Sequence, residues 1–143
     1  MATNCRFAFG THVMSVLALH HEGPCSSEML AQTVNTNAVV IRRLLLDLKE
    51  AGLIETQRGP GGGAILARPT GEITLAQIHR AVAGEIEPFG EHPNPPAQTC
   101  CVGREIKGVL ERVSNRARCA VEREFESVSL ADVLAEIQSP TAQ

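Results

Sequence analysis

The chain has 143 residues, of which 43% are apolar and 20% are charged, and its net charge is -3. This length suits one domain with a core, or a compact head with an oligomerisation arm, and excludes two large domains. No apolar run is long enough to cross a bilayer, and the start lacks the layout of a secretory signal, so we expect a cytoplasmic protein with no membrane partner. No nucleotide-binding loop, HExxH motif or Ser/His/Asp set is present, which argues against an enzyme.

The acidity is concentrated in the second half of the chain. Residues 1–83 hold 7 Lys/Arg against 6 Asp/Glu, a charge of +1, and residues 84–143 hold 6 against 10, a charge of -4. The first half can therefore present a basic surface to nucleic acid despite the negative total.

The first elements expected are two helices. Apolar residues at helical spacing predict a helix over residues 4–21, which a glycine and a proline then stop. Ser26 or Ser27 can cap a second, short helix over residues 28–34.

A third helix follows a tight polar turn and ends at Ala51-Gly52. One of its faces is apolar, and the opposite face carries Arg42 and Arg43. Two short helices joined by a tight turn, the second exposing paired arginines, are typical of a helix-turn-helix. The apolar face comprises Val40, Ile41, Leu44, Leu45 and Leu48.

Two strand-like runs, residues 53–57 and 64–66, surround a glycine-rich segment and predict a β-hairpin, which would form a wing. A capping box at Thr74 then opens a helix that extends through residues 78–82.

The second half predicts a loop and a long helix. Residues 84–99 contain four prolines and few apolar residues, and an apolar stripe then runs along residues 102–125. A helix of that length is roughly 36 Å long, too long for the head to cover, so a second copy of the chain would cover it. A last helix is expected over residues 130–137. The expected fold is mainly α with a small β-hairpin wing: a winged helix-turn-helix head (1–83), a hinge and sensing loop (84–101), and a dimerisation helix with a terminal helix (102–143).

Several motifs follow one another in a fixed order along nearly the whole chain. They are Cys5-Arg-Phe-Ala-Phe9, Thr36-Asn-Ala-Val-Val-Ile-Arg-Arg43, Leu48-Lys-Glu-Ala-Gly-Leu53, Arg58-Gly-Pro-Gly-Gly-Gly63, Glu72-Ile-Thr-Leu75, and His92-Pro-Asn-Pro95 ahead of Cys100-Cys-Val-Gly103. In this order they resemble the Rrf2 family of winged helix-turn-helix transcription regulators. The resemblance implies a homodimer, double-stranded DNA with a two-fold symmetric operator as partner, and an effector signal that enters near the cysteine-containing loop.

The third helix carries the residues that we expect to read bases. A guanidinium of Arg42 or Arg43 can bond the O6 and N7 acceptors of guanine, and Val39 can touch a thymine methyl group. The alternative is a solvated helix face. Asn35, Thr36 and Asn37 are expected to cap the helix, and they are also candidates to bind phosphate at its N-terminus.

The wing and the N-terminus supply further DNA-binding candidates. Arg58 would enter a minor groove, and we expect Arg6 to contact phosphate. Four glycines exceed what an ordinary hairpin turn needs, which favours a close approach of this backbone to DNA. These glycines are Gly59, Gly61, Gly62 and Gly63.

The five cysteines are odd in number and unevenly spaced, which predicts thiols in a reducing compartment. Cys100 and Cys101 lie at the start of a helix, Cys119 shares a helical face with arginines, and Cys25 lies in a loop, so these four are candidates for redox sensing. Cys5 is the cysteine we most expect to be inert.

Cluster-binding members of the family place three spaced cysteines in the loop before the long helix. Here Cys100 and Cys101 are adjacent, and neighbouring residues seldom offer both side chains to one cluster. His12, His92 or a residue of a second subunit could complete a set, so the metal ligands are unknown.

Three functions stay open at this point. The first is a repressor whose dimer leaves its operator when thiols are oxidised, with no cofactor. The second is the same fold holding an iron-sulfur cluster, and the third is a protein-interaction module with a vestigial winged helix. The arginine pair and the wing favour the first two.

Overall fold

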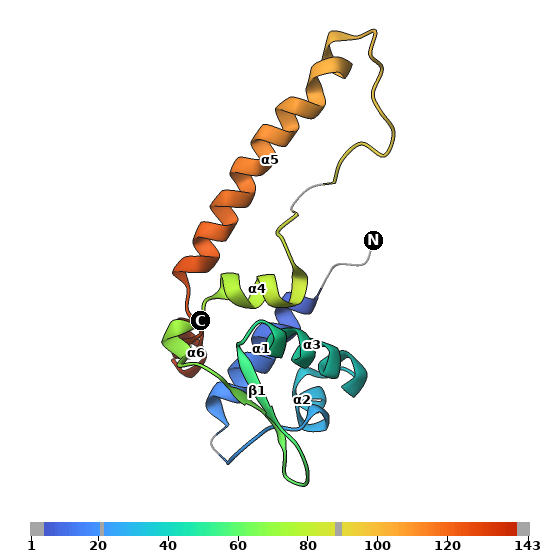
Figure 1. Cartoon of the computed structure of the whole chain (residues 1–143). Helices are drawn as coiled ribbons and strands as arrows, with labels where there is room; N and C mark the ends of the chain where they lie inside the picture. The colour runs from blue at the N-terminus through green and yellow to red at the C-terminus, as the bar shows by residue number, and fades with distance from the viewer. Residues whose placement is uncertain (1–4, 21, 88–89, 140–143) are drawn as a thin grey trace.

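The computed structural model describes residues 5–20, 22–87 and 90–139, and it confirms the expected mainly helical fold with one hairpin (Figure 1). The first predicted helix began at Asn4 and ended at His21, and both of these residues lie outside the described ranges. The elements in chain order are α1 (Arg6–Leu19), α2 (Ser27–Val34), α3 (Ala38–Glu50), β1 (Ile54–Gln57), β2 (Gly63–Leu66), the 3-10 helix η1 (Thr70–Glu72), α4 (Leu75–Ala83), α5 (Cys101–Ser127) and α6 (Leu130–Gln138).

All elements except α5 pack around one apolar core and form a head, from which α5 projects as an arm (Figure 1). The helices contribute their apolar stripes to this core, as the helical spacing of those residues requires. The largest fully buried side chains include Met14, Leu30, Ile41, Leu48, Ile78 and Leu130.

The turn between α2 and α3 depends on two asparagines. Asn35 ends α2 in the left-handed conformation, with φ 64°, which asparagine tolerates better than most residues. Asn37 is the N-cap of α3, and its Oδ1 accepts the backbone N–H of Val40 at 3.0 Å. The two caps fix the direction in which α3 leaves the turn.

The wing is a two-stranded antiparallel hairpin whose register runs from Ile54 opposite Leu66 to Gln57 opposite Gly63. Near the turn of the hairpin, β2 is tied to the segment before α2, because the N–H of Cys25 donates to the carbonyl of Ala64 at 3.0 Å and the N–H of Ala64 donates to the carbonyl of Cys25 at 2.8 Å. The head therefore holds the hairpin close to its turn, and the turn projects from the head (Figure 1).

Two capping boxes lie side by side where α5 leaves the head. Thr74 caps α4 with Gln77, Ser129 caps α6 with Asp132, and Thr74 and Ser129 are paired by an isolated β-bridge. The pairing holds α6 against the head, so that Leu130 and Leu134 join the core. The expected unit 102–143 combined α6 with the long helix, whereas in the structure α6 packs on the head.

The arm is attached to the head at its C-terminal end. The ring of Phe125 stacks on Phe7 of α1 with centroids 5.0 Å apart, and His79 of α4 lies 5.1 Å from Phe7. Beyond this contact α5 has no buried residue along its 27 residues, roughly 40 Å. No helix within the described ranges is long and apolar enough to cross a membrane.

Replacing the cap of α6 tests this arrangement. We expect Ser129→Ala to lower the free energy of unfolding by about 1 kcal/mol, because the backbone N–H of Asp132 then has no hydroxyl acceptor. Urea titrations at fixed protein concentration measure the change. Ser127→Ala is the matched control, since its hydroxyl only donates to the carbonyl of Glu124, and it should have a clearly smaller effect. Equal effects of the two substitutions would contradict the role of the cap.

Candidate nucleic-acid interface

The face of α3 that points away from the core carries the expected base-reading residues. Ile41, Leu44 and Leu48 are completely buried, so the opposite side of the helix must face solvent. Val39, Arg42 and Arg43 all lie exposed there, as predicted from the periodicity. The arrangement presents cations and apolar groups together on one helix.

The two arginines differ in their surroundings. Arg42 donates to Glu28 of α2 at 2.8 Å, in an ion pair whose side chains are both more than half exposed. The pKa of Glu28 is lowered by its own backbone N–H, then by hydrogen bonds from Arg42 and Ser27, so the carboxylate stays ionised near neutral pH. Arg43 has no ion-pair partner among the described residues, so its guanidinium is available to a ligand.

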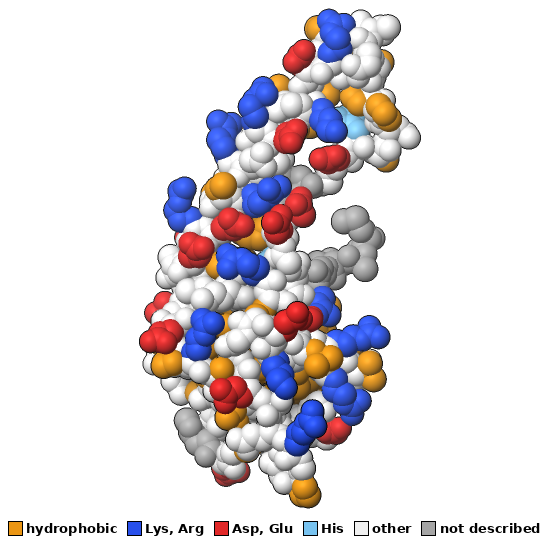
Figure 2. Space-filling view, viewed as in Figure 1, with side chains coloured by type: hydrophobic (Ala, Val, Ile, Leu, Met, Phe, Trp, Pro, Cys, Tyr) orange, Lys and Arg blue, Asp and Glu red, His pale blue; other side chains and the backbone are white. Residues whose placement is uncertain are grey.

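A groove of about 640 Å³ separates α3 from the wing. Three cations line it: Arg42 and Lys49 from α3, and Arg58 from the hairpin. Lys49 donates to the hydroxyl of Thr56 at 2.9 Å and so ties the end of α3 to β1. Figure 2 shows Lys and Arg side chains gathered over this part of the head. The local charge is basic although the chain as a whole is acidic.

The glycines of the wing tip have a structural explanation, which corrects the argument that four glycines exceed the needs of the turn. Gly59 and Gly61 have φ of 89° and 76°, which disfavours any residue with a Cβ. A Cβ on Gly62 would lie 2.2 Å from the carbonyl oxygen of Gln57, and one on Gly63 would lie 2.3 Å from that of Cys25. The number of glycines is therefore no evidence for a contact with DNA, and the exposed Arg58 is the residue of the tip that remains a candidate.

Arg6, expected at a phosphate, is engaged inside the head. Its guanidinium pairs with Asp47 of α3 and donates to the carbonyl of Val82 at the end of α4. This residue therefore joins three helices, and its role in the structure is to hold them together.

The turn residues Asn35, Thr36 and Asn37 lie at the start of α3, as expected. Asn35 and Asn37 are exposed and have the capping roles described above, and the N–H of Thr36 donates to the carbonyl of Ala31. These interactions at the helix ends explain the residue types in the turn, so they give no evidence that the turn binds a phosphate.

Leu46 and Lys49 belong to the same exposed surface, and the sequence analysis missed both. Each lies seven residues, or two helical turns, after a residue that was singled out: Leu46 after Val39, and Lys49 after Arg42. Extending the helical period by two turns would have found them.

The cysteines of the arm are exposed. Cys100 is the N-cap of α5, Cys101 is its first residue, and Cys119 lies further along the same helix. The backbone N–H groups of Gly103 and Val102, in the first turn of α5, lower the pKa of Cys100. The helix start therefore stabilises the thiolate of Cys100, as its position at a helix N-terminus predicted.

The prediction for Cys25 needs correction. Cys25 was a candidate for redox sensing because it lies in a loop, but the residue is 1% exposed, next to Ala64 near the turn of the wing, and burial raises its pKa. It is therefore not an accessible thiolate. Cys5 is exposed, and exposure alone does not make a thiol reactive.

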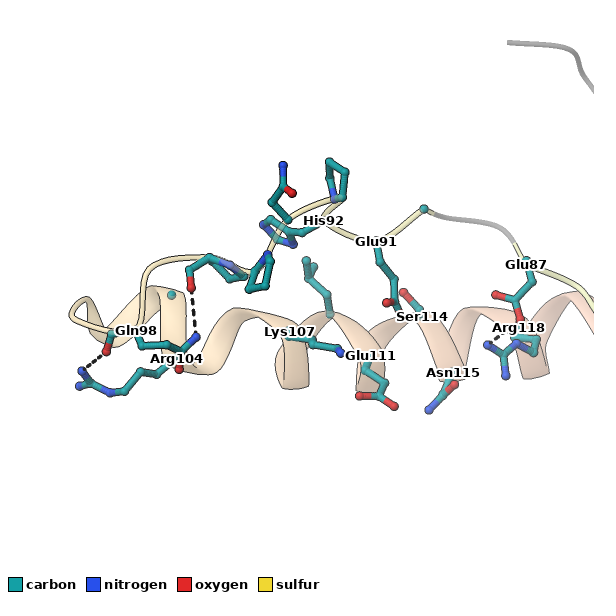
Figure 3. Close-up of a pocket in the computed structure, with 17 residues that line it drawn as sticks. Glu87, Glu91, His92, Gln98, Arg104, Lys107, Glu111, Ser114, Asn115 and Arg118 are labelled. Atoms are coloured by element: carbon teal, nitrogen blue, oxygen red, sulfur yellow. Dashed lines mark hydrogen bonds and ion pairs between the residues drawn. The ribbon is translucent and has the colours of Figure 1, made fainter.

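The loop before α5 runs alongside the helix and is held at both ends by arginines of α5 (Figure 3). Arg104 donates to the carbonyl of Gln98 at 3.0 Å, and Arg118 donates to that of Ile86 at 3.0 Å. Between these points the loop and the helix enclose a cleft of about 900 Å³, whose walls combine charged and polar side chains with Leu110 and three prolines. The contacts of Arg104 and Arg118 thus hold the loop against the arm.

An iron-sulfur cluster does not fit the donors of one described chain. Cys101 and Cys119 are separated by about 27 Å along a single helix. His12 of α1 and His92 of the loop are both exposed, and no group of three His, Cys, Asp or Glu residues among the described ones could hold a metal ion.

Comparison with known proteins agrees with this architecture. The model of the Rrf2 family, described as iron-dependent transcriptional regulators, matches residues 3–136. YwnA of Bacillus subtilis (strain 168), whose name includes the words "HTH-type transcriptional regulator", is 37% identical over 131 residues, which are 92% of this chain and 96% of YwnA.

Solved structures of the same family superpose over most of the chain. T. potens IscR is 28% identical, with a TM-score of 0.70 over 100% of this chain and 93% of that one. The oxidized form of Staphylococcus aureus CymR is 25% identical, with a TM-score of 0.68 over 94% of this chain and 96% of that one. The relatives are regulators and not enzymes, and the protein belongs to the Rrf2 family of DNA-binding transcription regulators.

Proposed function

We propose that this regulator is a homodimeric repressor that binds a two-fold symmetric operator and leaves it when thiols of the arm are oxidised. The observation that carries the proposal is the exposed face of α3, where Arg42 and Arg43 lie opposite a completely buried apolar stripe. Because such a helix fits the major groove, its side chains can reach base edges while the wing lies beside the phosphate backbone. Because the proposed ligand is DNA, we expect the protein to act in the cytoplasm.

A second copy of the chain accounts for the apolar stripe of α5. Val102, Val109 and Val113 are 60%, 41% and 45% exposed, and with Ile106 and Ala117 they recur at helical spacing along the arm. Each fully buried Val or Ile contributes roughly 1.5 to 3 kcal/mol, so pairing two such stripes would stabilise a dimer. Two recognition helices held in this way would have to match successive major grooves, roughly 34 Å apart.

Cys100 is the thiol that we expect to react first. The attack of its thiolate on hydrogen peroxide gives a sulfenic acid and releases hydroxide, and the lowered pKa increases the thiolate fraction near neutral pH. A sulfenic acid at the N-cap changes the first turn of α5, and therefore the packing of the arm.

A disulfide between Cys100 and Cys101 is disfavoured by geometry. Their Cα atoms are joined by one peptide unit and lie about 3.8 Å apart, below the roughly 4.4 to 6.8 Å that an unstrained disulfide spans. A second oxidation step would thus use a thiol of another molecule or of the partner subunit. The existence of an oxidized form of the S. aureus CymR structure supports oxidation as a signal within this fold.

The alternatives are weaker. The family description names iron, but no three His, Cys, Asp or Glu side chains in the described part of one chain lie close enough together to bind an iron-sulfur cluster. A protein-interaction module would not need the cations that line the groove beside α3.

Substitutions on α3 test the DNA contact. We expect Arg43→Ala to cost about 1 to 3 kcal/mol of discrimination between operator and random DNA, because its guanidinium has no competing partner. Arg42→Ala should reduce this discrimination less, since Arg42 must break its ion pair with Glu28 before it can contact DNA. Titrations of labelled duplexes selected from a random pool measure both. Arg80→Ala on α4 removes one exposed cation elsewhere and is the control. No operator preference in the parent protein would overturn the proposal.

Charged residues in the stripe of α5 test the dimer. The double substitution Val109→Glu and Val113→Glu should yield a monomer at micromolar concentration with weak operator binding, because burying the new charges is costly. Light scattering with size exclusion gives the mass. Asn115→Glu, on the opposite side of the same helix, should remain dimeric. A monomeric parent protein would exclude this assembly.

The reactivity of Cys100 tests the proposed sensor. In a Cys101→Ser background, iodoacetamide should alkylate Cys100 faster in the folded protein than in urea near pH 7, because unfolding restores the ordinary pKa. The pKa of Cys100 is lower in the folded protein than in the unfolded protein. At a pH well above the pKa of a free thiol both forms are fully thiolate, so the faster labelling of the folded protein should disappear. Peptide mass spectrometry follows the labelling.

Two further measurements complete this test. Cys100→Ser should keep operator binding when peroxide is added, whereas the parent protein should lose it. Protein purified without oxygen should contain little iron, and stoichiometric iron with sulfide would instead favour a cluster.

A further inference from the structure

Two apolar side chains occupy the centre of the solvent-facing side of α3. Leu46 is 66% exposed, the highest value for a large apolar residue in the described ranges, and Val39 is 54% exposed. A single exposed leucine is common on any protein surface. These two share one face with Arg42, Arg43 and Lys49, on the helix that we propose to enter the major groove.

The chemistry of the major groove explains why apolar groups lie among cations. Phosphates and the polar edges of bases attract arginine and lysine, whereas the C5 methyl group of thymine is the apolar group exposed in that groove. An apolar protein partner would favour one contiguous patch, but here Arg42 and Arg43 lie between the two side chains in the sequence. Isolated apolar contacts flanked by cations suit DNA better than a protein.

The spacing of the two residues matches DNA. Leu46 lies seven positions after Val39, so the two residues are about 10.5 Å apart along the helix axis. Three base-pair steps of B-DNA span about 10 Å. A helix lying along the groove would therefore place each side chain at its own base pair.

We propose that Val39 and Leu46 recognise the methyl groups of two thymines about three base-pair steps apart in each operator half-site, with Leu46 as a specificity-determining residue. Leu46 also lines the groove between α3 and the wing, beside Arg42, Lys49 and Arg58, so a DNA strand held by these cations would bring its bases towards it. The inference rests on the proposed function, because it needs operator DNA in contact with α3.

Deoxyuridine provides the test, because it pairs as thymine does and lacks only the methyl group. The full-length protein first selects its preferred duplex from a random pool, and each thymine of that duplex is then replaced in turn. We expect two positions per half-site, about three steps apart, at which the replacement weakens binding about fourfold, as expected for one lost buried methyl group. Fluorescence anisotropy measures each affinity.

Variants assign each methyl group to its side chain. Leu46→Ala should bind the thymine and deoxyuridine duplexes equally at one of the two positions, and Val39→Ala should do so at the other. Both residues are exposed, so their truncation should leave the fold intact. Ile137→Ala, an equally exposed apolar residue on α6, should keep both methyl effects.

Two outcomes separate this inference from the proposal on which it rests. A duplex that is selected but insensitive to every deoxyuridine, or a Leu46→Ala variant that keeps the methyl effect at both positions, would overturn the inference and leave operator binding standing. A pool from which no sequence is enriched would overturn the proposed function itself.

Discussion

The burial of one stripe of α3 is the constraint on which the proposed DNA-binding surface depends. Ile41, Leu44 and Leu48 are completely buried, and their contacts with the core fix the rotation of the helix about its axis. Because an α-helix has 3.6 residues per turn, this rotation turns Val39, Arg43 and Leu46 outwards together. The two asparagine caps then fix where the helix begins.

The first turn of α1 connects this surface to the arm. Arg6 bonds Asp47 of α3 and the end of α4, and the neighbouring Phe7 stacks on Phe125 of α5. Two adjacent residues thus contact α3 on one side and the base of the arm on the other. The paired caps at Thr74 and Ser129 add a second attachment of the arm to the head. The arm therefore contacts the head at two places, the Phe7–Phe125 stack and the Thr74–Ser129 pairing. A change in the packing of the arm would reach the head through these contacts.

The positive charge that DNA would meet is local to one groove of the head. The arm and its loop, residues 84–127, carry 8 of the 16 acidic residues, and the groove between α3 and the wing is lined by Arg42, Lys49 and Arg58. Net charge alone would have argued against a DNA-binding protein. The potential that a phosphate meets depends on nearby charges, because salt screens those that lie more than about 10 Å away.

Helical and alternating periodicity, capping boxes and glycine positions determined the order and type of the elements, because these signals act within a few residues. They also identified the exposed arginines of α3 and the position of Cys100 at a helix start. The tertiary structure decided what depends on contacts between distant segments. It placed Arg6 against Asp47, buried Cys25 beside Ala64 of the wing, and packed α6 on the head. A pattern of residue types along the chain gives the face on which a side chain lies, but the partner that meets that face is chosen by packing across the whole molecule.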